Sequence, residues 1–167
     1  MSFELELNRL YTQIAQQITD MIPTEWESFS FNGEVTDESG GVFFFFNPRD
    51  EKHQIYSHEI PELYSVDKKV YNKELNRLFE LSVELQKIFI ENNQEPWFSV
   101  TLLVNDAGKL NVHFDYTNWH KSEFGPTDRI EYFEYKSLKN EEVDLDKVER
   151  MQKYERESGM YNRNDGN

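Results

Sequence analysis

The residues whose types suit chemistry are concentrated in the segment "NVHFDYTNWHKSEFGPTDR", residues 111–129. The segment holds His113, Asp115, His120, Asp128 and Arg129. His113 and Asp115 lie two residues apart in an alternating pattern, which places both side chains on one face of a strand. With His120 in the following loop they would supply two imidazoles and a carboxylate, the ligand set of an open iron site. One alternative is therefore a metal-dependent enzyme, and the other is the polar face of a half-buried strand.

Other signatures of catalysis or cofactor binding are missing from the sequence. The chain has no Cys, which excludes disulfides and thiolate metal sites and indicates a reducing compartment. It has no glycine-rich phosphate loop, G-x-S-x-G elbow, H-E-x-x-H pair or EF-hand loop. Because the 111–129 segment has no local signature beyond its residue types, we expect no enzyme activity, no metal and no cofactor.

The charge balance bears on the kind of partner. The formal net charge is −14, and residues 1–66 hold 12 acidic against three basic residues. Such a field repels nucleic acid and acidic membranes and attracts basic proteins or cations over about 8–10 Å. The N-terminus lacks the basic segment of a signal peptide, and no apolar run reaches the ~20 residues of a membrane span, so we expect a cytoplasmic protein.

Periodicity predicts the elements that must position these residues. Apolar side chains at helical spacing predict one helix ending before Pro23 and a second, capped by Asp67, from Lys68 to about Asn92. Alternating or continuous apolar runs predict strands at residues 26–35, 41–47 and 53–60 and a hairpin over 97–116. Residues 127–138 favour a helix capped by Thr127 or Asp128, with a strand as the alternative, and a charged helix follows. The order α-β-β-β-α-β-β-α, with a C-terminal helix, indicates a single α+β domain on an antiparallel sheet.

The two faces of the predicted hairpin differ in polarity. Phe98, Val100, Leu102 and Val104 are expected to point toward the core. The opposite face is predicted to carry Trp97, Ser99, Thr101, Asn111, His113 and Asp115. This second face is the more polar one.

Five segments carry a family resemblance. In order they are "WESFSFNGEV", "GGVFFFFN", "QEPWFSVT", "GKLNVHFDY" and "FGPTDRIEYFEYKSL". In this order and spacing they resemble the YezG/EsaG-type immunity proteins over residues 1–138, with residues 139–167 as a charged C-terminal helix and tail of the same domain. The resemblance implies a cytoplasmic antitoxin that binds and silences the nuclease domain of a toxin exported by the type VII secretion system. It implies no catalytic residues.

Acidic and aromatic residues together suggest where a basic nuclease cleft would bind. We hypothesise an interface on the more polar face of the sheet, the loop 117–125 and the hairpin turn 34–40. Its residues are Glu34, Asp37, Glu38, Trp97, His113, Asp115, Trp119 and Phe124. The alternatives are that helices cover this face, that His113, Asp115 and His120 bind a metal, or that the protein is a chaperone that does not inhibit. The free protein is a possible homodimer.

Overall fold

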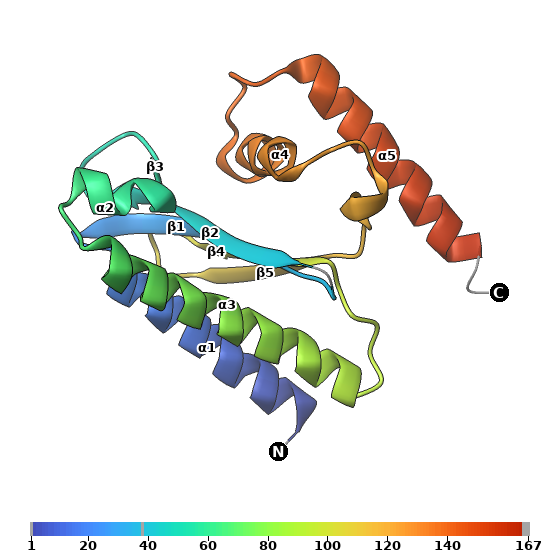
Figure 1. Ribbon diagram of the computed structural model, residues 1–167, viewed down its shortest axis with the longest axis horizontal. Helices are drawn as coiled ribbons and strands as arrows, with labels where there is room; N and C mark the ends of the chain where they lie inside the picture. The colour runs from blue at the N-terminus through green and yellow to red at the C-terminus, as the bar shows by residue number, and fades with distance from the viewer. Residues whose placement is uncertain (1, 38, 165–167) are drawn as a thin grey trace. The chain divides into compact units, whose positions relative to one another are not determined.

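Two long helices lie side by side on one face of a sheet (Figure 1). The computed structural model describes residues 2–37 and 39–164, with side chains through residue 159. Helix α1 spans Phe3–Met21 and begins where the Ser2 hydroxyl accepts the Leu5 N–H at 3.2 Å. Helix α3 spans Lys68–Glu91, and the Asp67 carboxylate caps it as predicted. Both helices arise from stripes of apolar residues that the sheet covers.

The sheet has five antiparallel strands in the order β3-β2-β1-β4-β5. Its strands are β1 (Trp26–Val35), β2 (Gly40–Pro48), β3 (Ile55–Tyr56), β4 (Ser99–Val104) and β5 (Leu110–Asp115). The long strand β1 is central, and its Phe31 lies opposite Phe44 of β2 and Leu102 of β4. The predicted α+β class, element order and antiparallel sheet are confirmed.

The core lies between the sheet and the two helices. Alternate strand residues point toward the helices, and Phe29, Phe31, Phe44 and Phe46 are buried there with at most 2% exposure. Each such ring contributes about 1.5–3 kcal/mol relative to an exposed one. On α1 and α3 the same core buries Leu10, Ile14, Ile18, Leu78 and Leu85. The aromatic richness of the sequence is thus largely used for packing.

The third predicted strand is mostly wrong. Pairing is limited to Ile55 and Tyr56, after which the chain turns into a 3₁₀ turn, η1 (Ser57–Glu59), and a short helix, α2 (Ile60–Leu63). Pro61 does not end a strand, because it occupies the first turn of α2, where its missing N–H costs nothing. The Ser57 hydroxyl accepts the Phe44 N–H at 3.1 Å and so takes the place of a further strand partner.

Residues 116–167 form a second compact unit, distinct from the first unit of residues 1–115. It contains η2 (Trp119–Lys121), α4 (Pro126–Leu138) and α5 (Leu145–Asn164). Helix α4 confirms the helical prediction for residues 128–138 and excludes the strand. Its cap is Gly125, not Thr127 or Asp128, because the Asp128 carboxylate accepts the Gly125 N–H at 3.1 Å from the third helical position. None of the described helices is long and apolar enough to cross a membrane.

Candidate interaction surfaces

The acidic hairpin between β1 and β2 holds two of the predicted contact residues. Glu34 lies on β1 opposite Gly41 and Ser99, and Asp37 is exposed in the turn. The turn is closed by the Thr36 N–H, which donates to the Ser39 carbonyl at 3.0 Å. Glu38 lies outside the described residues. Sequence reasoning therefore placed Glu34 and Asp37 correctly on one hairpin.

The sheet face opposite the helices has a polar half and an aromatic half. His113 is exposed and shares this face with Asp115 on β5, as the alternation predicted. On the neighbouring strands Asn32 donates to the Thr101 hydroxyl at 3.1 Å. Phe43 and Phe45 of β2 form a ring cluster with Tyr56, with ring-centre distances of 6.0, 6.1 and 5.1 Å. The β1, β4 and β5 part of this face therefore supplies polar groups.

Trp97 is not on that face, and its predicted position is wrong. It is 1% exposed and packs in the helix-covered core, 6.2 Å from Phe89 and 5.6 Å from Phe114 between ring centres. The reason is a local irregularity. The Phe98 N–H donates to the Asp115 carbonyl although the register pairs Ser99 with Asp115, so two successive residues oppose one. Alternation is shifted there, which turns Trp97 inward and leaves Phe98 outside the core cluster that contains Val100 and Leu102.

Trp119 and Phe124 are also buried, so the predicted exposed aromatic loop is wrong. Trp119 is 4% and Phe124 6% exposed. Within the second unit the Trp119 ring lies 6.1 Å from Phe124, 5.9 Å from Tyr132 on α4 and 5.3 Å from Tyr154 on α5. The Tyr154 hydroxyl donates to the Asn118 carbonyl at 2.6 Å. The sequence signal for this cluster is Tyr154, which continues the α5 stripe of Val148 and Met151 at a spacing of three.

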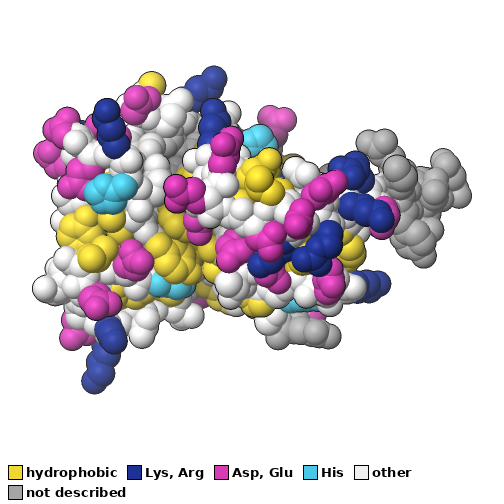
Figure 2. Space-filling model, turned by 90° about the horizontal axis from the view of Figure 1, so that it is seen from above, with side chains coloured by type: hydrophobic (Ala, Val, Ile, Leu, Met, Phe, Trp, Pro, Cys, Tyr) yellow, Lys and Arg dark blue, Asp and Glu magenta, His cyan; other side chains and the backbone are white. Residues whose placement is uncertain are grey.

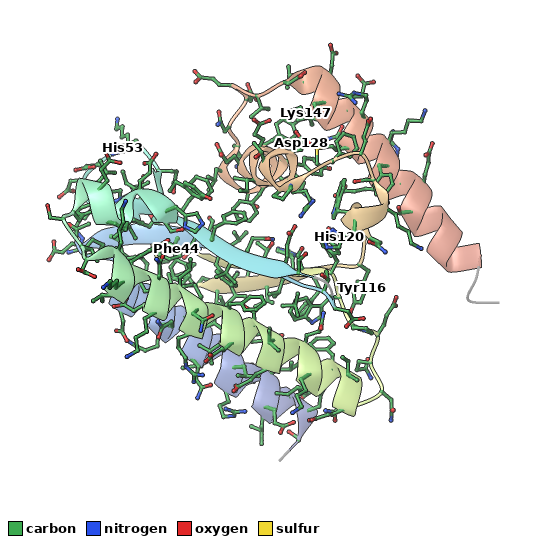
Figure 3. The ribbon with its side chains drawn as sticks, in the orientation of Figure 1. Phe44, His53, Tyr116, His120, Asp128 and Lys147 are labelled. Carbon is green, nitrogen blue, oxygen red and sulfur yellow. The ribbon has the colours of Figure 1, made fainter. Side chains whose placement is uncertain are left out.

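Asp128 and Arg129, at the end of the 111–129 segment, help to hold the second unit together. Lys147 of α5 lies 2.8 Å from Asp128 and 3.2 Å from Glu131 of α4, and Figure 3 shows Asp128 and Lys147 on these two helices. The hydrogen bond from Lys147 holds the pKa of Asp128 below its usual value, and the same bond raises the pKa of Lys147. Arg129 donates to the Phe124 carbonyl at 3.0 Å. These side chains have structural roles that the sequence pattern alone did not separate from chemical ones.

An open hollow at one end of the first unit was missed by sequence reasoning. It encloses about 630 Å³ between the end of α1, the start of β1 and the β4–β5 turn. Its lining includes the carboxylates of Glu25, Glu27 and Asp106, and its basic residue, Arg49, lies 3.4 Å from Glu25. Trp26 supplies apolar surface. The acidic pair around Trp26 is visible in the sequence, but Asp106 joins it only through the fold.

On the face that Figure 2 shows, the carboxylates do not gather into one block. Figure 2 shows Asp and Glu side chains at many separate points of the visible surface. Among the residues that the structure describes, no group of three or more His, Cys, Asp or Glu side chains is arranged to hold a metal ion.

Comparisons with known proteins identify the family. The family model described as "Immunity protein YezG-like" matches residues 7–152. The chain is 34% identical over 160 residues to the "Type VII secretion system protein EsaG" of Staphylococcus aureus, which covers 94% of this chain and 98% of that protein. It is also 35% identical to the "Immunity protein YezG" of Bacillus spizizenii over 133 residues, which covers 80% of this chain and 83% of that protein. The chain belongs to the YezG-like family of immunity proteins, whose role implies a toxin as partner.

The match extends beyond residue 138 into α5. The division of the chain at residue 138 stays a prediction, whereas the structure itself separates residues 1–115 from 116–167.

Proposed function

We propose that this immunity protein neutralises the nuclease domain of a toxin exported by the type VII secretion system, by stoichiometric binding in the cytoplasm and without catalysis of its own. The observation that carries the proposal is the family match over residues 7–152. The full-length similarity to a protein named for type VII secretion supports the secretion route. The net charge of −14 supports a basic, DNA-handling target.

Charge complementarity gives this function a physical basis. A nuclease presents a basic cleft to DNA, and an acidic inhibitor meets it with the opposite potential. Steering of this kind raises association rates to as much as ~10⁸–10⁹ M⁻¹s⁻¹ at low salt. A fast encounter protects the chromosome, because each free nuclease molecule can cleave DNA until it is bound.

The proposed contact surface combines the acidic hairpin with the polar half of the sheet face opposite the helices. It comprises Glu34, Asp37, Glu38, His113 and Asp115. The carboxylates of the open hollow around Trp26 lie at the opposite end of β1 from this hairpin and are not part of the surface. Trp97, Trp119 and Phe124 are left out of this surface because their side chains are buried.

A titration of nuclease activity tests the function. The purified toxin nuclease domain is incubated with plasmid DNA and increasing amounts of the immunity protein, and complex formation is measured in parallel by calorimetry. Cleavage should stop at one molar equivalent, at the stoichiometry of binding. A complex that forms while DNA cleavage continues would show a chaperone and would contradict the proposal.

A matched pair of charge reversals tests the surface. Changing Glu34, Asp37 and Glu38 to Lys should lower the association rate at low salt by about tenfold or more and reduce its salt dependence. The control changes Glu62, Glu84 and Glu95 to Lys, which alters the net charge equally. Equal effects of the two triple variants would show that only net charge matters and would remove the hairpin from the proposed surface.

A further inference from the structure

The two edges of the sheet are finished in different ways. On one edge β3 pairs with β2 through two residues only, and the Ser57 hydroxyl then accepts the Phe44 N–H. The η1 turn, which follows β3, packs against β2. A side chain and a short helical segment thus replace the strand that would otherwise be needed here.

The opposite edge, β5, carries no such device. Its six residues, "LNVHFD", include no Pro, Gly or Lys, and no described strand pairs with its outer side. Natural proteins protect exposed edge strands with prolines, lysines, bulges or very short strands, because an open edge is a template for pairing with another chain. Leu110 at its start is 37% exposed.

Hydrogen bonds to β4 fix which backbone groups of β5 face outward. The Lys109 carbonyl accepts the Asn105 N–H at 3.1 Å, and the Asp115 carbonyl accepts the Phe98 N–H at 2.8 Å. Odd-numbered residues of β5 therefore turn their backbone groups toward β4. In an antiparallel ladder the alternate residues Leu110, Val112 and Phe114 then present their N–H and C=O groups to the open edge.

We propose that the free protein dimerises by antiparallel pairing of β5 with β5 of a second copy, about a two-fold axis at Val112. This inference goes beyond the proposed function. In this register Val112 faces Val112 of the second copy, and Leu110 faces Phe114 of the second copy. All three outward-facing residues are then paired, with about six backbone hydrogen bonds across the interface. The two five-stranded sheets become one continuous sheet.

The side chains of β5 are self-complementary in this register. On the helix-covered face the partly exposed Leu110 gains an aromatic neighbour. On the other face Asn111 lies opposite His113 of the second copy, and Lys109 lies opposite Asp115 of the second copy. Shifting the second strand by two residues in either direction loses this Lys–Asp pair, so charge selects the register. A closed two-fold interface of this kind covers the β5 edge of both copies and forms no fibre.

Sedimentation velocity over a range of protein concentrations, combined with hydrogen exchange, tests the dimer. We expect a concentration-dependent dimer in which the amides of Leu110, Val112 and Phe114 exchange more slowly as concentration rises. Val112→Pro removes an outward N–H and should raise the dissociation constant at least ~100-fold, while the circular dichroism spectrum is kept because that N–H is not bonded to β4. A monomer at all concentrations, or an unchanged dimer in Val112→Pro, would overturn the proposal.

A charge swap keeps the test decisive if the proline variant does not fold. Lys109→Glu places like charges opposite each other at two symmetric positions and should weaken the dimer about tenfold. The double variant Lys109→Glu with Asp115→Lys should restore the dissociation constant of the dimer to within about threefold of the wild-type value. No rescue would refute this register. Protection of β5 amides only after the nuclease domain is added would assign the edge to the toxin instead and overturn the dimer. Nuclease inhibition is a separate readout, so either proposal can fail alone.

Discussion

Two neighbouring glycines of β2 should respond in opposite ways to the same substitution. A Cβ on Gly40 would lie 2.5 Å from the Glu34 carbonyl oxygen and 2.6 Å from a ring carbon of Phe79. A Cβ on Gly41 would meet no atom within 4 Å. Both residues belong to the same strand pair, so a difference between Gly40→Ala and Gly41→Ala reports the local contact alone.

The expected size of the difference follows from these distances. Non-bonded heavy atoms approach favourably to about 3.5 Å, so the Gly40 contact is about 1 Å too short. Phe79 can move aside, but the Glu34 oxygen is part of β1, which is paired with β2 and β4 on its two sides. Gly40→Ala should therefore destabilise the protein by about 1–3 kcal/mol, the range for overpacking. Gly41→Ala should be neutral or stabilise by up to about 1 kcal/mol, because alanine restricts the unfolded chain.

Urea unfolding followed by circular dichroism measures both effects. We expect the free energies of unfolding of the two variants to differ by about 2 kcal/mol with similar denaturant slopes. Equal stabilities within about 0.5 kcal/mol would refute the reasoning, because the β1–β2 hairpin would then adapt freely to a methyl group at Gly40.

Three further predictions concern buried or paired polar groups. Trp97→Phe should cost less than about 1 kcal/mol in urea unfolding, because the buried indole N–H has no hydrogen-bond partner and its removal offsets the lost ring volume; a loss of ~3 kcal/mol would contradict this. His58 Nδ1 lies 2.7 Å from the Tyr71 hydroxyl, burial lowers the pKa of His58 and burial raises the pKa of Tyr71 to about 12, so the folded state favours neutral imidazole. Stability should be full above the ordinary histidine pKa of about 6.5 and fall as pH drops through it, and His58→Gln should flatten this dependence in unfolding curves between pH 5 and 8. The pKa of Asp128 is lowered by Lys147, so its contribution should be present above about pH 4 and lost below it, and Asp128→Asn should speed hydrogen exchange at the start of α4 at neutral pH.

The helices and long strands could be predicted because their signals are local. The apolar stripes of α1 and α3 and the capping Asp67 lie within the elements that they define. The strand predicted over residues 53–60 was wrong because Ile55 and Tyr56, which do pair in β3, suggested a longer strand. The Ser57 hydroxyl bond to Phe44 and the helical position of Pro61 depend on the fold around them.

The candidate site was harder to predict because exposure is a tertiary property. Alternation placed His113 correctly, but one extra residue at Phe98 reversed the facing of Trp97. Trp119 and Phe124 were assigned to a solvent-exposed loop because their partner Tyr154 comes about 30 residues later in the sequence. A polar loop with isolated rings has the same sequence pattern whether a later helix covers the rings or not.

The burial of these rings changes how binding data on the protein should be interpreted. Aromatic residues are usual hot spots, and a loss of inhibition in Trp119→Ala would ordinarily be assigned to a lost contact. Here the Trp119 ring packs with Phe124, Tyr132 and Tyr154, so truncation removes about 3–5 kcal/mol of packing from the small second unit. A change in inhibition by such a variant must therefore be compared with its loss of stability before a toxin contact is assigned to Trp119. Asp37 is exposed and belongs to the proposed contact surface, so its reversal is expected to lower the association rate while the free energy of unfolding stays nearly the same. Measuring stability and association rate on the same variants therefore separates the residues that build this immunity protein from those that contact its toxin.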